Sequence, residues 1–332
     1  MIKLLYAGDK HIRGTNPRNR LDDYKAALKR KFEELFRIAE EEKVDAILDP
    51  GDLFDSPNVS IGILLEFADI LSKSPVPYYL TAGNHDIYGY NLDTYWRTSL
   101  ALMERLVPQL EVINDPSQSI ILRKNELTHL LEVQLTFTPY SGDIDRDGYG
   151  YSPEVEEPLE GAYRIHVSHG MLLDHTPPFD RFTLVQDVKT TADLVLTGHC
   201  HIGYGVQRRP DGVTFANIGS FTRLAANHAE IKRDIQALLI TVRGPKNASL
   251  EVIKLESAKL GADVLDRSRI EAEKKRQYAM DTFSALIKTD EGQEAIVDIP
   301  GILEMIASKE VTNPEAIKLA LEKIEQAREH LE

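Results

Sequence analysis

Hydrophobic runs of strand length alternate with longer amphipathic stretches through the first third of the chain. The runs are residues 2–7, 44–48 and 76–80. Residues 21–42 carry hydrophobic side chains at helical spacing, Asn58 or Ser60 can cap a second helix that ends near Ser72, and a third helix is expected over residues 96–106. Strands that alternate with helices predict a parallel sheet with helices packed on it.

The pattern becomes richer in strands beyond residue 119. Further runs of strand length are residues 120–123, 130–137, 163–168, 194–197, 205–209, 213–217, 235–242 and 250–255. The segment Arg209-Pro210-Asp211-Gly212 has the residue types of a hairpin turn between two of them. An α/β first part followed by a β-rich second part predicts two packed sheets with helices outside.

The character changes again near residue 260. Residues 261–332 hold 10 Lys/Arg and 16 Asp/Glu, and residues 263–287 have the pattern of a long charged helix. Asn313-Pro314 is a helix start signal. The hydrophobic residues on one face of that last helix are Ile317, Leu321, Ile324 and Leu331. This stripe either packs back on the main domain or docks a partner helix. We therefore expect one domain over 1–260 and a helical region over 261–332.

Composition narrows the class of protein. Hydrophobic residues make up 42% of 332, and no hydrophobic run is long enough to cross a membrane. The single cysteine, Cys200, excludes an intrachain disulfide, so we expect a reducing, cytoplasmic location. A net charge of −14 argues against nucleic-acid binding, although basic residues cluster near the start of the chain. Nucleic acid is thus expected to meet only that local cluster.

Hard oxygen and imidazole donors follow five of the hydrophobic runs. The fragments are Asp9-Lys10-His11, Gly51-Asp52, Gly83-Asn84-His85-Asp86, Ser168-His169-Gly170 and Gly198-His199-Cys200-His201. Loops after parallel strands are where open α/β sheets hold ligands, and these donors suit divalent transition metals. His166 lies three residues before His169, so alternation along a strand directs it to the opposite face, and we interpret it as structural.

The five fragments, in this order, resemble those of the calcineurin-like metallophosphoesterases over roughly residues 1–255. The resemblance implies a four-layer αββα sandwich and two divalent metal ions, manganese first, with iron or zinc as alternatives. It assigns Asp9, His11 and His201 to one metal, assigns Asn84, His169 and His199 to the other, and makes Asp52 the bridge. It also implies that His85 acts on the phosphate without binding metal, with Asp86 beside it in the catalytic set.

The form Gly-Asp-Leu-Phe-Asp, ending at Asp55, is similar to that of SbcD-type bacterial repair exonuclease subunits. This implies DNA cleavage, a coiled-coil SMC-like ATPase partner and, as an alternative to a monomer, a homodimer. The candidates for DNA contact are Arg13, Arg18, Arg20 and Tyr88, with further aromatic residues up to Trp96. A phosphoesterase for small phosphodiesters or phosphoproteins remains the alternative, and a non-enzymatic binding scaffold is a third.

A second metal motif lies in residues 143–154. Asp143, Asp145, Asp147 and Glu154, with Gly148 between them, match the spacing of an EF-hand calcium loop. Nearby prolines and the lack of flanking helical patterns favour an exposed acidic loop instead. The sequence therefore leaves two interpretations of residues 143–154, a calcium site and an exposed acidic loop.

Overall fold

The structure is a computed structural model that describes residues 1–125, 130–155, 158–268, 275–278 and 280. The chain divides into two compact units, Met1–Arg267 and Ser268–Glu332. The second unit, which holds the predicted hydrophobic stripe and most of the helix predicted over 263–287, falls largely outside the described residues. The predicted start of that helix is wrong, because a short helix over Gly261–Val264 ends there and Leu265 has an extended backbone.

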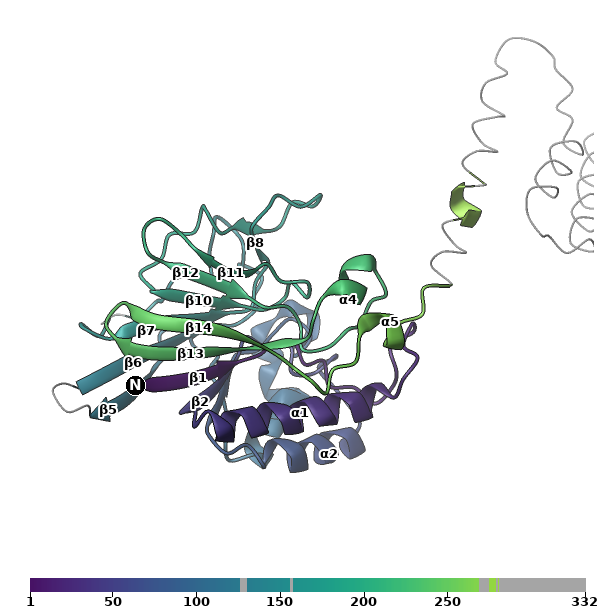
Figure 1. Cartoon of the computed structure of the whole chain (residues 1–332), viewed down its shortest axis with the longest axis horizontal. Coiled ribbons are helices and arrows are strands. Elements are labelled where there is room, and N and C mark those ends of the chain that lie inside the picture. The colour runs from purple at the N-terminus through teal and green to yellow at the C-terminus, as the bar shows by residue number, and fades with distance from the viewer. Residues whose placement is uncertain (126–129, 156–157, 269–274, 279, 281–332) are drawn as a thin grey trace, which may run out of the picture. The chain divides into compact units, whose positions relative to one another are not determined.

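Two six-stranded sheets form the first unit (Figure 1). The first sheet has the order β14-β13-β1-β2-β3-β4. Its strands are β1 (Ile2–Tyr6), β2 (Ala46–Asp49), β3 (Tyr78–Leu80), β4 (Leu110–Val112), β13 (Gln236–Gly244) and β14 (Asn247–Lys254). Strands β1 to β4 are parallel, and β13 joins β1 antiparallel, with Leu4 opposite Ile240.

The second sheet has the order β11-β12-β10-β7-β6-β5. Its strands are β5 (Ser119–Asn125), β6 (Leu130–Thr138), β7 (Tyr163–Ser168), β10 (Leu194–Thr197), β11 (Gly205–Arg208) and β12 (Thr214–Asn217). The four strands β6, β7, β10 and β12 are parallel, and the edge strands β5 and β11 are antiparallel to their neighbours. The predicted turn at residues 209–212 joins β11 to β12.

The hydrophobic runs are continuous because the strands of the first sheet are buried on both faces. Leu5 and Ile47 point to the helices, whereas Leu4 and Leu48 point into the space between the two sheets. The helices that cover the first sheet are α1 (Tyr24–Glu41), α2 (Ile61–Leu71) and α3 (Ser99–Leu106). Helix α2 is capped by Ser60, one of the two predicted caps, whereas α3 starts three residues later than predicted.

The late start of α3 has a local cause. Thr98 has an extended backbone, and its side chain accepts a hydrogen bond from the amide of Ala101, which caps the helix there. The preceding residues form two short 3₁₀ turns, η1 (Tyr88–Tyr90) and η2 (Leu92–Arg97). The segment that follows the Gly-Asn-His-Asp motif is therefore a structured loop.

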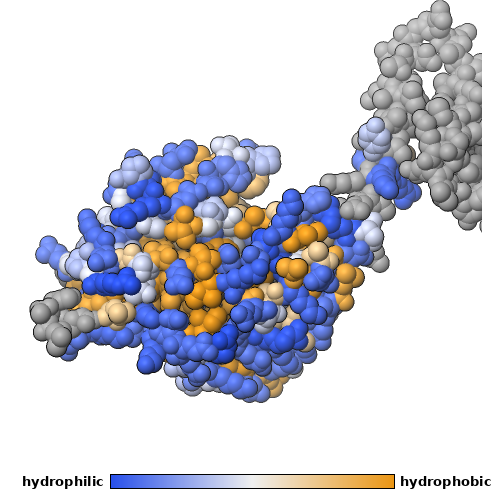
Figure 2. Space-filling view, in the orientation of Figure 1, coloured by the Kyte–Doolittle hydropathy of each residue, from blue (hydrophilic) through white to orange (hydrophobic). Residues whose placement is uncertain are grey.

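The outer face of the second sheet has a different cover. Here the packing partners come from the segment around β8 (Leu172–Leu173) and β9 (Thr183–Leu184) and from Tyr151, instead of from a helix of the described residues. The short helices α4 (His228–Lys232) and α5 (Gly261–Val264) follow β12 and β14. In Figure 2, hydrophobic residues reach the surface around β13 and β14, where Val252 is 42% exposed.

Candidate metal centre

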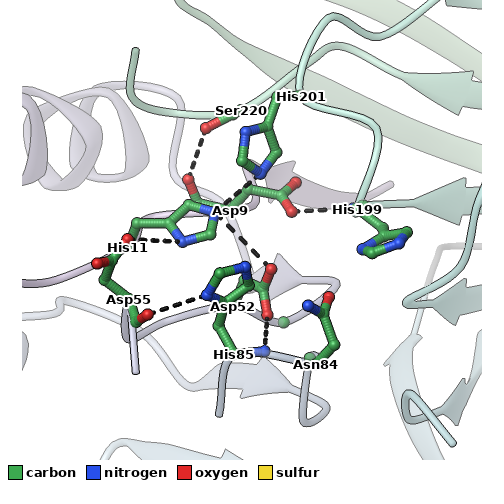
Figure 3. Close-up of polar contacts among 12 residues, drawn as sticks. Asp9, His11, Asp52, Asp55, Asn84, His85, His199, His201 and Ser220 are labelled. Carbon is green, nitrogen blue, oxygen red and sulfur yellow. Dashed lines mark hydrogen bonds and ion pairs between the residues drawn. The ribbon is translucent and has the colours of Figure 1, made fainter. Parts of the chain in front are cut away.

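The five motif fragments meet at the carboxyl ends of the parallel strands. The loops after β1, β2 and β3 of the first sheet face those after β7, β10 and β12 of the second. A parallel bridge between Gly8 and Ser220 joins the two sets, and the Ser220 hydroxyl donates to the carbonyl of Asp9 at 2.8 Å. Figure 3 shows the side chains that converge there. Residues far apart in sequence thus form one cluster.

One group of side chains contains Asp9, His11, Asp52 and His201, whose nearest ligand atoms all lie within 4.8 Å of one another. The Nε2 atoms of His11 and His201 are 2.9 Å apart. A hydrogen bond from the amide of His199 to the Asp9 carboxylate, at 2.9 Å, holds that side chain in place. This is the set that we expected around the first metal.

A second group contains Asp52, His169 and His199. The Asn84 side-chain oxygen lies 3.0 Å from His169 Nε2, and the other nitrogen of His169 is 3.0 Å from the carbonyl of Pro50. Asp52 belongs to both groups, and its Oδ1 accepts the amide of His85 at 2.8 Å (Figure 3). The structure therefore places the predicted bridging carboxylate between the two predicted sets.

The backbone of the centre is strained at the motif residues. Asp9, His11, Asp52 and His199 all have left-handed φ values, between 48° and 69°, which non-glycine residues rarely adopt. Such strain concentrates at functional sites because the surrounding fold holds it. Gly83 is required by close approach, since a Cβ there would lie 2.2 Å from Asp52 Oδ1. The glycines in the motifs thus allow the loops to meet.

Polar atoms of the cluster that lack a hydrogen-bond partner indicate that its side chains suit divalent cations. Asp52 Oδ2 is buried without a hydrogen-bond partner, although buried carboxylate oxygens are normally paired. Burial also holds the pKa of His11 well below its usual range, so its imidazole is neutral, as a metal ligand must be. Asp52 Oδ2 lies 3.3 Å from His169 Nε2 and 3.7 Å from His11 Nε2. Imidazole nitrogens gathered around a carboxylate oxygen that has no hydrogen bond are the arrangement that a shared cation would satisfy.

His85 has the freedom that its predicted role needs. Its Nδ1 lies 2.9 Å from the carbonyl of Asp55, so that nitrogen carries the proton and Nε2 is left for a substrate. The ring stacks edge-on against His11, with 4.9 Å between centroids. His85 also belongs to a group with His11 and Asp55. Nε2 is thus the ring nitrogen of His85 that a phosphate held at the centre could meet.

Asp86, predicted beside His85 in the catalytic set, holds the loops beneath the centre. Its carboxylate is fully buried and accepts the amides of Leu53, Phe54 and Gly83. Burial and the nearby Asp52 carboxylate raise its pKa to about 7. Asp86 therefore joins the loops after β2 and β3 beneath the centre and positions Asp52 and His85.

Sequence reasoning missed a buried ion pair under the same loops. Lys10, between two motif residues, donates to the carboxylate of Asp49 at 2.7 Å, and both side chains are inaccessible to solvent. The Tyr78 hydroxyl donates to the same carboxylate at 2.7 Å, and the amide of Gly51 does so at 3.0 Å. A lysine between Asp9 and His11 was the available signal, but nothing in the sequence points to its partner.

The four candidates for DNA contact differ in their availability. The prediction for Arg20 is wrong, because its side chain is 5% exposed and is bound by Asp22 and the carbonyl of Arg223. Arg13 pairs with Asp55 at 2.8 Å at the edge of the centre. Arg18 is exposed and has no partner among the described residues. The ring of Tyr88 is faced by the Arg97 guanidinium at 5.2 Å, so this tyrosine is already engaged.

The four candidate calcium ligands of residues 143–154 are not brought together in the described part of the chain. Asp145 is buried, and its carboxylate accepts the Thr183 hydroxyl at 2.9 Å, the Met171 amide at 2.8 Å and the Tyr151 hydroxyl. Asp143 is exposed and pairs with Arg146. Asp147 and Glu154 are not gathered with them in any cluster of potential ligands found among the described residues. The acidic spacing serves loop structure instead of an ion.

The surroundings of His166 agree with the structural role predicted for it. His166 is buried in the second sheet beside the hydroxyls of Thr136 and Thr138 and the carbonyl of Gly150, which confirms its structural role. Burial lowers its pKa to about 4.

Among the described residues, no helix combines the length and hydrophobicity that membrane spanning requires.

Comparison with known proteins defines the class. The model of the calcineurin-like phosphoesterase family matches residues 2–203. The match covers more than half of the chain, which therefore belongs to this family of metal-dependent hydrolases. The family assignment, the enzyme class and the use of divalent metals are thus confirmed.

The relatives include two proteins named as DNA double-strand break repair protein Mre11. The chain is 25% identical to that of Methanosarcina mazei over 239 residues, which are 69% of this chain and 35% of that protein. It is 34% identical to that of Methanosarcina acetivorans over 90 residues, 26% of this chain and 14% of that protein. The chain thus spans about a third of the length of the Methanosarcina mazei protein. A solved structure, TT1561 of Thermus thermophilus, is 14% identical, with a TM-score of 0.43, over 75% of this chain and 98% of that one.

Proposed function

We propose that the chain is a two-metal phosphodiesterase that cleaves DNA, in the manner of SbcD-type repair nucleases. The observation that carries this proposal is the position of Asp52, whose carboxylate is common to both groups of potential ligands. A shared carboxylate holds two cations close enough to act on one phosphate. The similarity to two DNA repair proteins and the aspartate at position 55 favour DNA as the substrate.

Two divalent cations, proposed as manganese with iron or zinc as alternatives, would neutralise the charge that develops on the phosphate. Asp9, His11 and His201 would hold one of them, and Asn84, His169 and His199 the other, with Asp52 shared. The protein itself supplies His85, which keeps its Nδ1 proton on the Asp55 carbonyl. In the imidazolium form, with both ring nitrogens protonated, it would donate the Nε2 proton to the leaving oxygen. Asp86 and the Lys10–Asp49 pair hold these loops in place.

The test is cleavage of end-labelled single- and double-stranded DNA with added manganese. We expect metal-dependent cleavage by the wild type and its loss in Asp52→Asn, because one carboxylate serves both cations. Normal turnover with two bound metals in Asp52→Asn would refute the bridging role. Hydrolysis of bis-p-nitrophenyl phosphate without any cleavage of DNA would instead favour the small-phosphodiester alternative, which the net charge of −14 supports.

The DNA contact is proposed to rest on Arg18, the exposed and unpaired arginine of the loop that follows the first motif. Arg18→Glu should weaken DNA cleavage and spare bis-p-nitrophenyl phosphate hydrolysis, because phosphate contacts outside the centre matter only for the polymer. Arg30→Glu, on an exposed position of α1, is the matched control. Equal loss on both substrates in Arg18→Glu would mean that the residue supports the fold.

A partner is proposed for the chain beyond residue 260. The hydrophobic stripe of Ile317, Leu321, Ile324 and Leu331 suits burial against a coiled-coil helix of an ATPase subunit. Replacing Leu321 and Ile324 with aspartate in the full chain should abolish capture of such a subunit and leave oligonucleotide cleavage intact. Capture at wild-type affinity by that variant would contradict the proposal.

A further inference from the structure

A row of aromatic rings leads away from the second group of ligands. The ring of Tyr140 lies 5.5 Å from that of His199 and 6.1 Å from that of His169, measured between centroids. The ring of Tyr90 lies 5.6 Å from that of Tyr140. Tyr140 is 9% exposed and Tyr90 is 59% exposed. The row therefore begins beside the metal centre and ends in solvent.

Tyr140 is held rigidly at the inner end of this row. Its amide donates to the carbonyl of Ala82, just before the Gly-Asn-His-Asp motif, at 2.9 Å. The guanidinium of Arg181 donates to the carbonyls of Ser141, Gly142 and Ile144 and so fixes the turn behind the tyrosine. The buried carboxylate of Asp145 accepts the Met171 amide and the Thr183 hydroxyl and so joins the next turn to that segment. The loop that follows Tyr140 is thus held at two successive turns.

Tyr90 is held in an unusual backbone conformation at the outer end. It has a φ of 59°, directly after Gly89 with a φ of 58°, and a left-handed conformation is rare for an aromatic residue. Its hydroxyl has no hydrogen-bond partner within the described part of the chain, and its ring contact is with Tyr140. The neighbouring Tyr88 is covered by Arg97, and Tyr95 donates its hydroxyl to Glu104. Tyr90 is therefore the tyrosine of this segment whose ring is available.

We propose that Tyr90 and Tyr140 bind one unpaired nucleobase of the substrate, next to the phosphate held by the centre. The proposal rests on the proposed phosphodiesterase function and deepens it by naming the group that is recognised. Every base has a π face, so an exposed tyrosine stacks on it without sequence preference. The two rings are inclined at 53°, so a base stacked on Tyr90 meets Tyr140 at an angle.

This site predicts a preference for nucleotides that are not base-paired. A base inside a duplex is covered on both faces by its neighbours and cannot stack on a protein ring unless it leaves the helix. Stacking also suits an acidic chain, since it does not depend on the counterion release that Lys and Arg would provide. Recognition of the base thus compensates for the small number of free cations near the centre.

The test compares two ligands that share a phosphate and differ in the base. Binding of thymidine 5′-monophosphate and of 2-deoxyribose 5-phosphate to the full-length, manganese-loaded protein is measured by calorimetry. We expect the wild type to bind the nucleotide roughly 5- to 150-fold more tightly, the range that stacking of one base gives. Tyr90→Ala should bring the ratio near one, and Tyr90→Trp should preserve it.

The control is Trp96→Ala, which removes a ring that is 71% exposed and has no ring contact with the histidines in the described part of the chain. This variant should keep the wild-type ratio. An equal affinity of the wild type for both ligands, no measurable binding of the nucleotide, or an unchanged ratio in Tyr90→Ala would each overturn the proposal. Because binding is measured, a protein that cleaves no DNA can still show the ratio, so failure of the nuclease proposal is distinguished from failure of the base site.

Discussion

Replacing Lys10 with methionine tests whether the buried ion pair supports the centre. The change keeps the length of the side chain and leaves the Asp49 carboxylate in the interior without its cation. Removing one partner of a buried pair costs about 3–5 kcal/mol, because the other charge stays buried and uncompensated. Asp49 keeps the hydrogen bonds from Tyr78 and Gly51, so we expect a loss near the lower end, about 3 kcal/mol in the free energy of unfolding.

The assay is urea unfolding followed by circular dichroism, with thermal melting beside it. A loss of about 3 kcal/mol corresponds to a fall in melting temperature of roughly 6–12 °C for a domain of this size. Lys25→Met is the control, because Lys25 pairs with Glu66 at the surface, with side chains 35% and 30% exposed, and such pairs contribute at most about 1 kcal/mol. Adding Asp49→Asn to Lys10→Met removes the stranded charge and should restore most of the stability.

Two results would refute this reasoning. If the free energy of unfolding of Lys10→Met lies within about 1 kcal/mol of the wild-type value, the pair does not stabilise the fold. If Asp49→Asn gives no recovery in the Lys10→Met background, the loss came from packing and not from an unpaired carboxylate. Because Lys10 lies between Asp9 and His11, weaker manganese binding by calorimetry should accompany the loss of stability.

Three other predictions concern single residues. His85→Ala should lose roughly two to four orders of magnitude in kcat on bis-p-nitrophenyl phosphate, as is usual for loss of a general acid. Elemental analysis should show that the variant keeps its metals. Loss of metal would place His85 among the ligands. Calcium at millimolar concentration should leave the melting temperature of the wild type unchanged, and a calcium-dependent rise in that temperature would support the ion site. Asp145→Ala should lower the free energy of unfolding by about 1–3 kcal/mol, because buried donors lose their acceptor. The pKa of His166 falls from 6.5 to about 4 on folding, so the unfolded state binds more protons between these values and stability falls as pH drops through that window. His166→Asn should abolish about 3 kcal/mol of that pH dependence in urea unfolding at pH 4 to 7, and an unchanged slope would contradict it.

Much of the fold follows from local sequence, because the strands of the first sheet are buried on both faces. Leu4 and Leu5 point into different cores, so the run that contains them is hydrophobic throughout and marks a strand. The motif residues could likewise be located, since a ligand at a strand end sits beside its strand in the sequence. The sequence therefore predicts that Asp9, Asp52 and Asn84 meet, because each follows a strand of the same parallel sheet. Their roles as metal ligands remain predictions.

The remaining features depend on contacts between residues far apart in the chain, which no local pattern contains. The spacing of Asp143 to Glu154 matches a calcium loop, yet the Asp145 carboxylate is buried and already accepts hydrogen bonds from Tyr151, Met171 and Thr183. Arg20 is one of several arginines in sequence, and its pairing with Asp22 and the carbonyl of Arg223 makes it unavailable. Composition and periodicity thus determine which segments form strands and helices. The packing of one loop against another decides which polar groups remain available to bind a metal or a substrate. The reason is that a buried polar group forms hydrogen bonds with the neighbours that the fold places beside it.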